Sequence, residues 1–171
     1  MSLKADSIVQ NPIKTQWVAA LKSGEYLKTY RRLRRDLPEG SGFCCLGVLC
    51  DLHAKATNNP AAWTLTPPHT RFSTMQKEYK YLETAISYPP KQVYSWLQGD
   101  NDTIPYLSKK LIDLLKPTEM QELKAFCSTF SGDQKWIAPL ADRETGESFL
   151  MGLNDSGATH AQIAEVIEKW L

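Results

Sequence analysis

The stretch GFCCLGVLCDL, from Gly42 to Leu52, constrains the fold of this chain more than any other. Apolar residues in and just after it recur at the spacing of one helical face, namely Cys45, Val48, Leu49, Leu52 and Ala56. We therefore expect a helix from Cys44 to about Lys55 that is buried along one face and ends before Pro60. Gly47, which has no side chain, would let another element approach this helix closely.

Three of the four cysteines of the chain lie in this stretch, and packing is their simplest role. Free cysteine is among the most buried residue types and behaves as a small apolar side chain. The helical stripe takes Cys45 into the core, and Cys50 shares a second flank with Leu46. Cys50 and His53 form a single short-spaced pair, whereas a structural zinc site usually shows two, so we expect no metal.

Cys44 is the one cysteine that this helical pattern leaves available for catalysis. A thiol in the first turn of a helix lies near free backbone N–H groups and the positive end of the dipole, and both favour the thiolate. A cysteine enzyme also needs a histidine base from elsewhere in the fold. The chain offers three histidines for that role: His53, His69 and His160.

The basic run KTYRRLRR, residues 28–35, holds most of the positive charge of the N-terminal part. Residues 1–40 carry eight Lys/Arg and four Asp/Glu, a charge of +4, so the remainder carries −3 of the total of +1. Guanidinium groups bind phosphate in a bidentate manner, and a tyrosine can stack on a base. The simpler alternative is a solvated face or salt bridges to the acidic remainder. The candidate ligand-binding residues are Tyr30, Arg31, Arg32, Arg34 and Arg35.

The segment LNDSGATHAQIAEVIE, from Leu153, opens with four turn formers. The simplest interpretation is a junction between a strand and the last helix. Asn154 and Asp155 are nevertheless candidate ligand contacts, because polar side chains exposed at the end of a strand can face a ligand.

The remaining pattern indicates one helix-dominated α+β domain with a small, mainly antiparallel sheet, covering residues 11–171, after a flexible extension over residues 1–10. The ranges 26–35 fit either a helix or a strand, and 36–42 has the composition of a loop. We expect further helices over 12–23, 89–98, 107–115, 118–130 and from 159 onward. We expect strands over 63–66, 80–88, 136–140 and 148–153, with a turn over 142–146.

Several classes of protein are disfavoured by composition. No run approaches the roughly 20 apolar residues of a membrane span, and the N-terminus lacks the apolar core of a signal peptide. We expect a soluble protein of the host-cell cytoplasm with no membrane partner. A net charge of +1 does not favour sequence-specific nucleic-acid binding.

Three blocks of the chain, WVAALKSGEY (17–26), GFCCLGVLCDL (42–52) and LNDSGATHAQIAEVIE (153–168), resemble a family of small phage- and prophage-encoded proteins. The segment from Pro89 to Leu97 resembles a fourth block of that family. The resemblance implies a phage accessory gene whose product modifies, sequesters or blocks something in the host, including defence signalling. It assigns no catalytic residue.

These observations lead to three hypotheses about function, none of which requires a cofactor. The first is a phage binding protein that sequesters or blocks a host protein or a small phosphate-bearing ligand, such as a nucleotide, in counter-defence. The second is a cysteine-dependent hydrolase or transferase with Cys44 as nucleophile. The third is a structural module that assembles as a homo-oligomer.

Overall fold

The structure is a computed structural model that describes residues 11–66, 77–98, 107–130 and 144–171. The flexible extension predicted over residues 1–10 and the strand predicted over 136–140 lie outside the described residues, as do residues 142 and 143 of the predicted turn over 142–146.

The described strands form one five-stranded sheet with the order β1-β3-β2-β5-β4. Three of its pairings are antiparallel, and the pairing of β1 with β3 is parallel. The prediction of a mainly antiparallel sheet is therefore confirmed. The strands are β1 (Leu27–Lys28), β2 (Arg34–Leu37), β3 (Gly40–Phe43), β4 (Trp63–Leu65) and β5 (Glu78–Tyr81).

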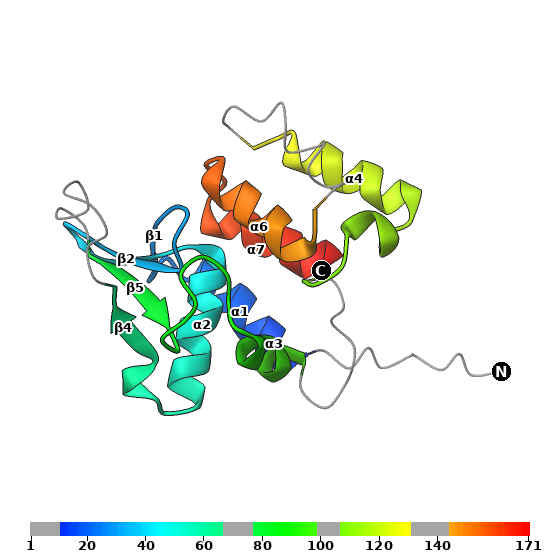
Figure 1. The fold of residues 1–171 in the computed structure, drawn as a ribbon. Helices are drawn as coiled ribbons and strands as arrows, with labels where there is room; N and C mark the ends of the chain where they lie inside the picture. Colours follow the sequence, from blue (N-terminus) through cyan, green and yellow to red (C-terminus); the bar gives the residue numbers. More distant parts are fainter. Residues whose placement is uncertain (1–10, 67–76, 99–106, 131–143) are drawn as a thin grey trace.

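Helices make up most of the described regular structure, which confirms the prediction of a helix-dominated α+β domain. In Figure 1 the sheet lies on one side of α2, and α6 and α7 lie on the other side with α4 beyond them. The helices are α1 (Pro12–Lys22), α2 (Cys45–Ala56), α3 (Lys91–Gln98), α4 (Pro117–Cys127), α6 (Gly146–Asp155) and α7 (His160–Trp170). Single 3-10 turns cover Pro60–Ala62 and Leu111–Asp113.

The first and last helices begin as the sequence predicts. The Asn11 side chain accepts hydrogen bonds from the backbone N–H groups of Ile13 and Lys14, with Pro12 at the first helical position. At the start of α7, Thr159 and Gln162 form the predicted capping box. The helix α1 packs against both α2 and α7, and the Trp17 indole N–H donates to the Cys45 carbonyl at 2.9 Å.

The helix α2 lies at the centre of the core and is buried more widely than one stripe predicts. Leu46 and Cys50 are buried together with the predicted stripe residues Cys45, Val48 and Leu49. The rest of the predicted stripe differs, because Leu52 is half-buried and Ala56 is exposed at the end of the helix. Gly47 explains how the sheet reaches this helix, because a Cβ atom added there would lie 1.8 Å from the Leu33 carbonyl oxygen. That same carbonyl accepts a hydrogen bond from the Cys44 N–H, so the first turn of α2 rests on the backbone that precedes β2.

Two predicted elements are wrong. Residues 148–153 form part of helix α6 instead of a strand, because Thr145 caps a helix by accepting from the Ser148 N–H and one helical face is buried against α2 and α7. The helix predicted over 107–115 is reduced to the 3-10 turn Leu111–Asp113.

Other boundaries move. The range 26–35 resolves into two strands with an irregular corner between them, and the predicted loop 36–42 supplies both arms of the β2–β3 hairpin. The strand predicted over 80–88 is β5, which ends at Tyr81. The N-cap of α4 is Lys116, two residues before the predicted N-cap Thr118, since the Glu119 carboxylate accepts from the Lys116 N–H. The helix ends at Cys127 instead of Phe130.

Candidate functional site

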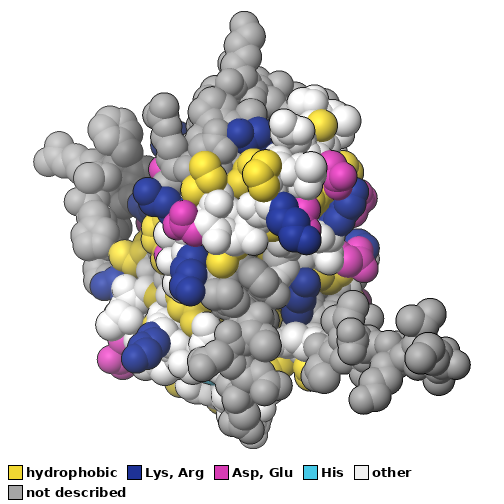
Figure 2. Space-filling view, turned by 90° about the vertical axis from the view of Figure 1, so that its right-hand side faces the viewer, with side chains coloured by type: hydrophobic (Ala, Val, Ile, Leu, Met, Phe, Trp, Pro, Cys, Tyr) yellow, Lys and Arg dark blue, Asp and Glu magenta, His cyan; other side chains and the backbone are white. Residues whose placement is uncertain are grey.

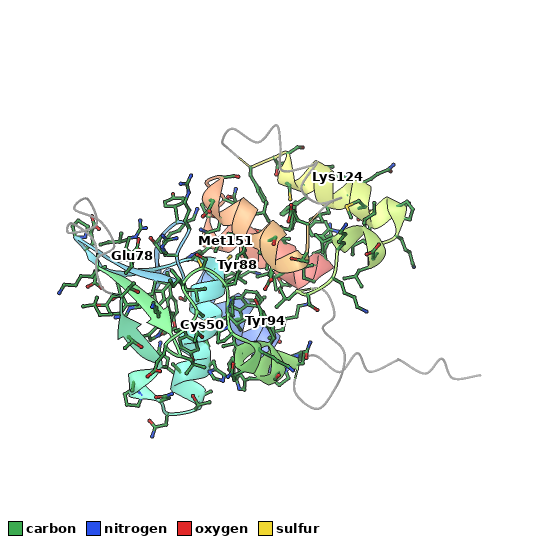
Figure 3. The ribbon with its side chains drawn as sticks, in the orientation of Figure 1. Cys50, Glu78, Tyr88, Tyr94, Lys124 and Met151 are labelled. Atoms are coloured by element: carbon green, nitrogen blue, oxygen red, sulfur yellow. The ribbon has the colours of Figure 1, made fainter. Side chains whose placement is uncertain are left out.

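Two of the four arginines in the basic run are committed to a salt-bridge network on the sheet. The Glu78 carboxylate in β5 accepts from Arg32 Nε at 2.9 Å with one oxygen and from Arg35 Nη2 at 2.7 Å with the other. These two arginines lower the pKa of Glu78 against the opposing effect of its burial. Figure 3 shows Glu78 in the sheet, on the side of the molecule away from Lys124 of α4.

Arg34 is committed to an aromatic cluster on the other face of the same strand. Its guanidinium lies 4.2 Å from the ring centroid of Tyr79 and 5.6 Å from those of Phe43 and Trp63. Its Nη2 donates to the Ser41 hydroxyl at 3.0 Å. Cation–π contacts and a hydrogen bond therefore hold this side chain within the fold.

Arg31 differs from its neighbours in both its backbone and its side chain. Its φ of 60° lies in the left-handed region that non-glycine residues rarely adopt. Its N–H donates to Asp155 Oδ1 at 2.9 Å, and its carbonyl accepts from the Ser87 hydroxyl at 3.1 Å. The guanidinium is exposed and makes no hydrogen bond or ion pair with any of the described residues.

Tyr30 precedes Arg31 and exposes 47% of its surface. The Lys28 ammonium lies 4.6 Å from the centroid of the Tyr30 ring and donates to the Ala158 carbonyl at 2.6 Å. Burial lowers the pKa of Lys28. We call the group formed by Tyr30, Arg31, Ser87 and Asp155 the Arg31 corner.

Asn154 ties this corner to the start of α2. Its side chain is fully buried, accepts from the Cys45 N–H at 3.3 Å and donates to the Thr29 carbonyl at 2.9 Å. Its amide also donates to Asp155 Oδ1 at 3.2 Å. The Asn154 amide is therefore engaged within the fold and positions Asp155. The structure also brings the predicted candidates Tyr30, Arg31, Asn154 and Asp155 to one corner. Arg31 and Asp155 make contact there although 124 residues separate them in the sequence.

The predicted nucleophile Cys44 is the N-cap of α2 and has no exposed surface. Its Sγ accepts from the Gly47 N–H at 3.3 Å. Burial raises the pKa of the Cys44 thiol to about 12 and outweighs the backbone N–H groups of Gly47 and Leu46, which lower it. The structure thus presents a neutral, buried thiol at this position.

The other cysteines and the described histidines also face the interior. Burial raises the pKa values of Cys45 and Cys50 well above the ordinary thiol value. The His53 ring shares a 2.7 Å hydrogen bond with the Tyr81 hydroxyl. Among the described residues no hydrogen bond joins a cysteine to a histidine, and His69 lies outside them.

The described residues contain no group of three or more His, Cys, Asp or Glu that could hold a metal ion. Across those same residues, none of the helices has the length and apolarity needed to cross a membrane.

Sequence reasoning missed two residues that bind the arginines. Glu78 forms salt bridges with Arg32 and Arg35, and Ser87 donates to the carbonyl of Arg31. The motif EYKY, residues 78–81, alternates charged residues with tyrosine, which is typical of a strand with one charged and one aromatic face. The pairing of Arg34 with Tyr79 and of Arg35 with Glu78 across β2 and β5 follows this alternation. Ser87 carries no comparable signal, because its contact with Arg31 depends on how two loops meet.

The fold and this corner together define a small α+β protein in which a strained, exposed arginine is held at the meeting point of three segments. A family model described as a domain of unknown function (DUF8296) matches residues 9–171, and the chain belongs to that family. No curated protein and no solved structure matches the chain.

Proposed function

We propose that this protein acts by binding and that the Arg31 corner takes an anionic, phosphate-bearing ligand. The observation that carries the proposal is that three arginine side chains of the basic run have partners within the fold and the fourth has none among the described residues. Arg32, Arg34 and Arg35 are engaged by Glu78 and by aromatic rings, whereas the Arg31 guanidinium is exposed and meets none of the described residues. A guanidinium fork suits phosphate because it can donate two parallel hydrogen bonds.

The backbone of Arg31 gives a second reason for the proposal. A non-glycine residue in the left-handed region costs roughly 1–2 kcal/mol, and such residues cluster at ligand sites where the surroundings hold them. Here Asp155 accepts a hydrogen bond from the Arg31 N–H, and Ser87 donates one to the Arg31 carbonyl. The two residues come from distant segments and stabilise this backbone conformation. The loop is thereby fixed before a ligand arrives, which reduces the ordering cost of binding.

The resemblance to phage-encoded proteins supplies the context of the proposal. We propose that the protein is a phage accessory factor of the host cytoplasm that sequesters a small ligand in counter-defence. The burial of Cys44 disfavours the alternative of a cysteine-dependent hydrolase or transferase, because a nucleophile must be ionised and reachable.

The alternative of an oligomerisation module has less support from the described surface. The large exposed apolar side chains, such as Leu65 and Ile112, belong to different elements, and single exposed apolar residues are ordinary on monomers. Figure 2 shows a face on which Lys/Arg and Asp/Glu side chains are interspersed and hydrophobic side chains form small groups.

The test is calorimetric titration of the protein with inorganic pyrophosphate. Arg31→Gln removes the positive charge. Glutamine is also a non-glycine residue, so the energetic cost of the left-handed backbone conformation stays the same in both proteins. A charge-assisted hydrogen bond contributes about 1.5–3 kcal/mol, so we expect Arg31→Gln to weaken binding by roughly 10-fold to 100-fold. The matched control is Lys109→Gln, which removes one exposed positive charge outside the corner and should change affinity less than about twofold.

Two results would contradict the proposal. One is the absence of any pyrophosphate binding by the unaltered protein. The other is equal affinity in the unaltered protein and Arg31→Gln, with thermal denaturation showing that both are folded.

A further inference from the structure

We infer that the ligand of the Arg31 corner is a nucleotide, with its phosphates on Arg31, its hydroxyl or amino groups on Asp155 and its base against Tyr30. This inference rests on the proposed function and narrows the class of ligand. It comes from the chemical contrast among the side chains of three residues at this corner, of which Tyr30 and Arg31 are consecutive and Asp155 bonds the Arg31 backbone.

Asp155 makes the corner a better match for an anion that also carries hydrogen-bond donors than for a bare anion. Its Oδ1 accepts from the Arg31 N–H at 2.9 Å and from the Asn154 amide at 3.2 Å. Its Oδ2 has no hydrogen-bond partner within the described part of the chain. A carboxylate bonded to the backbone of Arg31 repels a simple phosphate that approaches this residue, and a ligand that also carries hydrogen-bond donors turns the same carboxylate into a favourable contact.

Ribose hydroxyls and exocyclic amino groups are donors of this kind, and a carboxylate that accepts from ribose hydroxyls is a common feature of nucleotide sites. Because the two interactions of Oδ1 fix the carboxylate, Oδ2 is oriented before the ligand binds. Arg31 supplies donors only and Asp155 supplies acceptors only, so the pair selects a ligand with an anionic part and a donor part close together.

Tyr30 supplies the aromatic surface. It lies next to Arg31 in the chain and exposes 47% of its surface, while the Lys28 ammonium lies 4.6 Å from its ring centroid. Lys28 is itself held by the Ala158 carbonyl at 2.6 Å, which restrains the ring from one side. A base can stack on the exposed part, since every base has a π-face and such stacking does not depend on sequence.

Tyr88, the residue after Ser87 of the corner, carries a second exposed aromatic ring. Tyr88 follows Ser87, whose hydroxyl donates to the Arg31 carbonyl, and exposes 44% of its surface. Figure 3 labels Tyr88 in the loop that precedes α3.

The experiment compares ADP with inorganic pyrophosphate, which share the diphosphate group and differ in the ribose and base. We expect the unaltered protein to bind ADP at least tenfold more tightly than pyrophosphate. Tyr30→Ala should weaken ADP binding about tenfold and leave pyrophosphate binding within twofold. Tyr30→Phe, which keeps the ring, is the matched control and should bind ADP within about threefold of the unaltered protein.

Asp155→Asn tests the preference of the corner for ADP over pyrophosphate. Its side-chain oxygen can still accept from the Arg31 N–H, so the corner keeps its backbone, and thermal denaturation checks this. We expect pyrophosphate to bind more tightly because the repulsion is gone. The diphosphate of ADP gains from the same relief, but ADP also loses an acceptor for its donors, so the ratio of ADP affinity to pyrophosphate affinity should fall several-fold.

The outcomes separate the inference from the proposed function. Pyrophosphate binding that depends on Arg31, with ADP no tighter and Tyr30→Ala without effect, overturns the nucleotide inference and leaves anion binding standing. Failure of both ligands to bind overturns both.

Discussion

The basic run contains four arginines, Arg31, Arg32, Arg34 and Arg35, and their surroundings give these identical side chains different roles. Glu78 engages Arg32 and Arg35, and the Tyr79 ring lies under Arg34. Strand pairing separates the roles of Arg34 and Arg35, because β2 places alternate side chains on opposite faces of the sheet. The sequence alone could indicate a basic, ligand-binding run, but it could not tell which arginine remains for a ligand.

The cysteines show the same dependence on packing at the level of single residues. The prediction that Cys45 lies in the core is confirmed. The position of Cys44 at a helix start is also confirmed, but the thiol is buried there and burial raises its pKa to about 12. Two opposing effects act on this thiol, and the loss of solvation is the larger one.

We therefore predict that the thiols of the native protein react slowly with a thiol-specific reagent at pH 8. All four cysteines are free and buried, and the thiolate is the reactive form. In a disulfide-exchange assay, most of the four equivalents should appear only after addition of denaturant. Rapid, stoichiometric modification of Cys44 in the native protein, located by peptide mass analysis, would reinstate the cysteine-enzyme hypothesis.

Elements defined by local signals were predictable, and elements defined by distant partners were not. The helices α1, α2 and α7 begin at capping residues and carry apolar stripes that the sequence displays. The hairpin arms of 36–42 have loop composition, yet Gly42 suits its strand because a Cβ there would lie 2.6 Å from a Leu37 side-chain atom. The sequence pattern of α6 wrongly predicts a strand, because apolar residues outnumber polar ones over a short stretch of this helix.

The contact between α2 and the backbone before β2 leads to a prediction for Gly47→Ala. Helix propensity alone favours alanine by about 1 kcal/mol, but its Cβ would lie 1.8 Å from the Leu33 carbonyl oxygen. We expect the overlap to dominate and the free energy of unfolding to fall by about 1–3 kcal/mol in urea titrations.

The control for that experiment is Ala56→Gly at the exposed end of the same helix, which measures propensity without a steric change. It should lower the free energy of unfolding by no more than about 1 kcal/mol. An unchanged or increased stability of Gly47→Ala would contradict the close approach of α2 to Leu33.

At the scale of the whole molecule, the sequence blocks 17–26, 42–52 and 153–168 meet at one place. Trp17 of the first block donates to Cys45 of the second, and Cys45 in turn donates to Asn154 of the third. Asn154 also holds the Thr29 carbonyl, next to the Arg31 corner. The sequence showed the blocks, but their convergence depends on the packing of α1, α2 and α6.

This convergence explains how a core built from distant segments can support a surface site. The buried amide of Asn154 positions Asp155, and Asp155 holds the strained backbone of Arg31. The exposed guanidinium and the Tyr30 ring are therefore carried on a rigid part of the fold, as ligand sites generally require.

The most direct test of the central claim is to locate the bound ligand by amide chemical-shift mapping of the isotope-labelled protein during titration with ADP. The Arg31 corner predicts that the largest shifts fall on the amides of Tyr30, Arg31, Ser87 and Asp155, with little change in α4. These shifts should vanish in Arg31→Gln. Largest shifts on another surface, or shifts at the corner that persist unchanged in Arg31→Gln, would contradict the account.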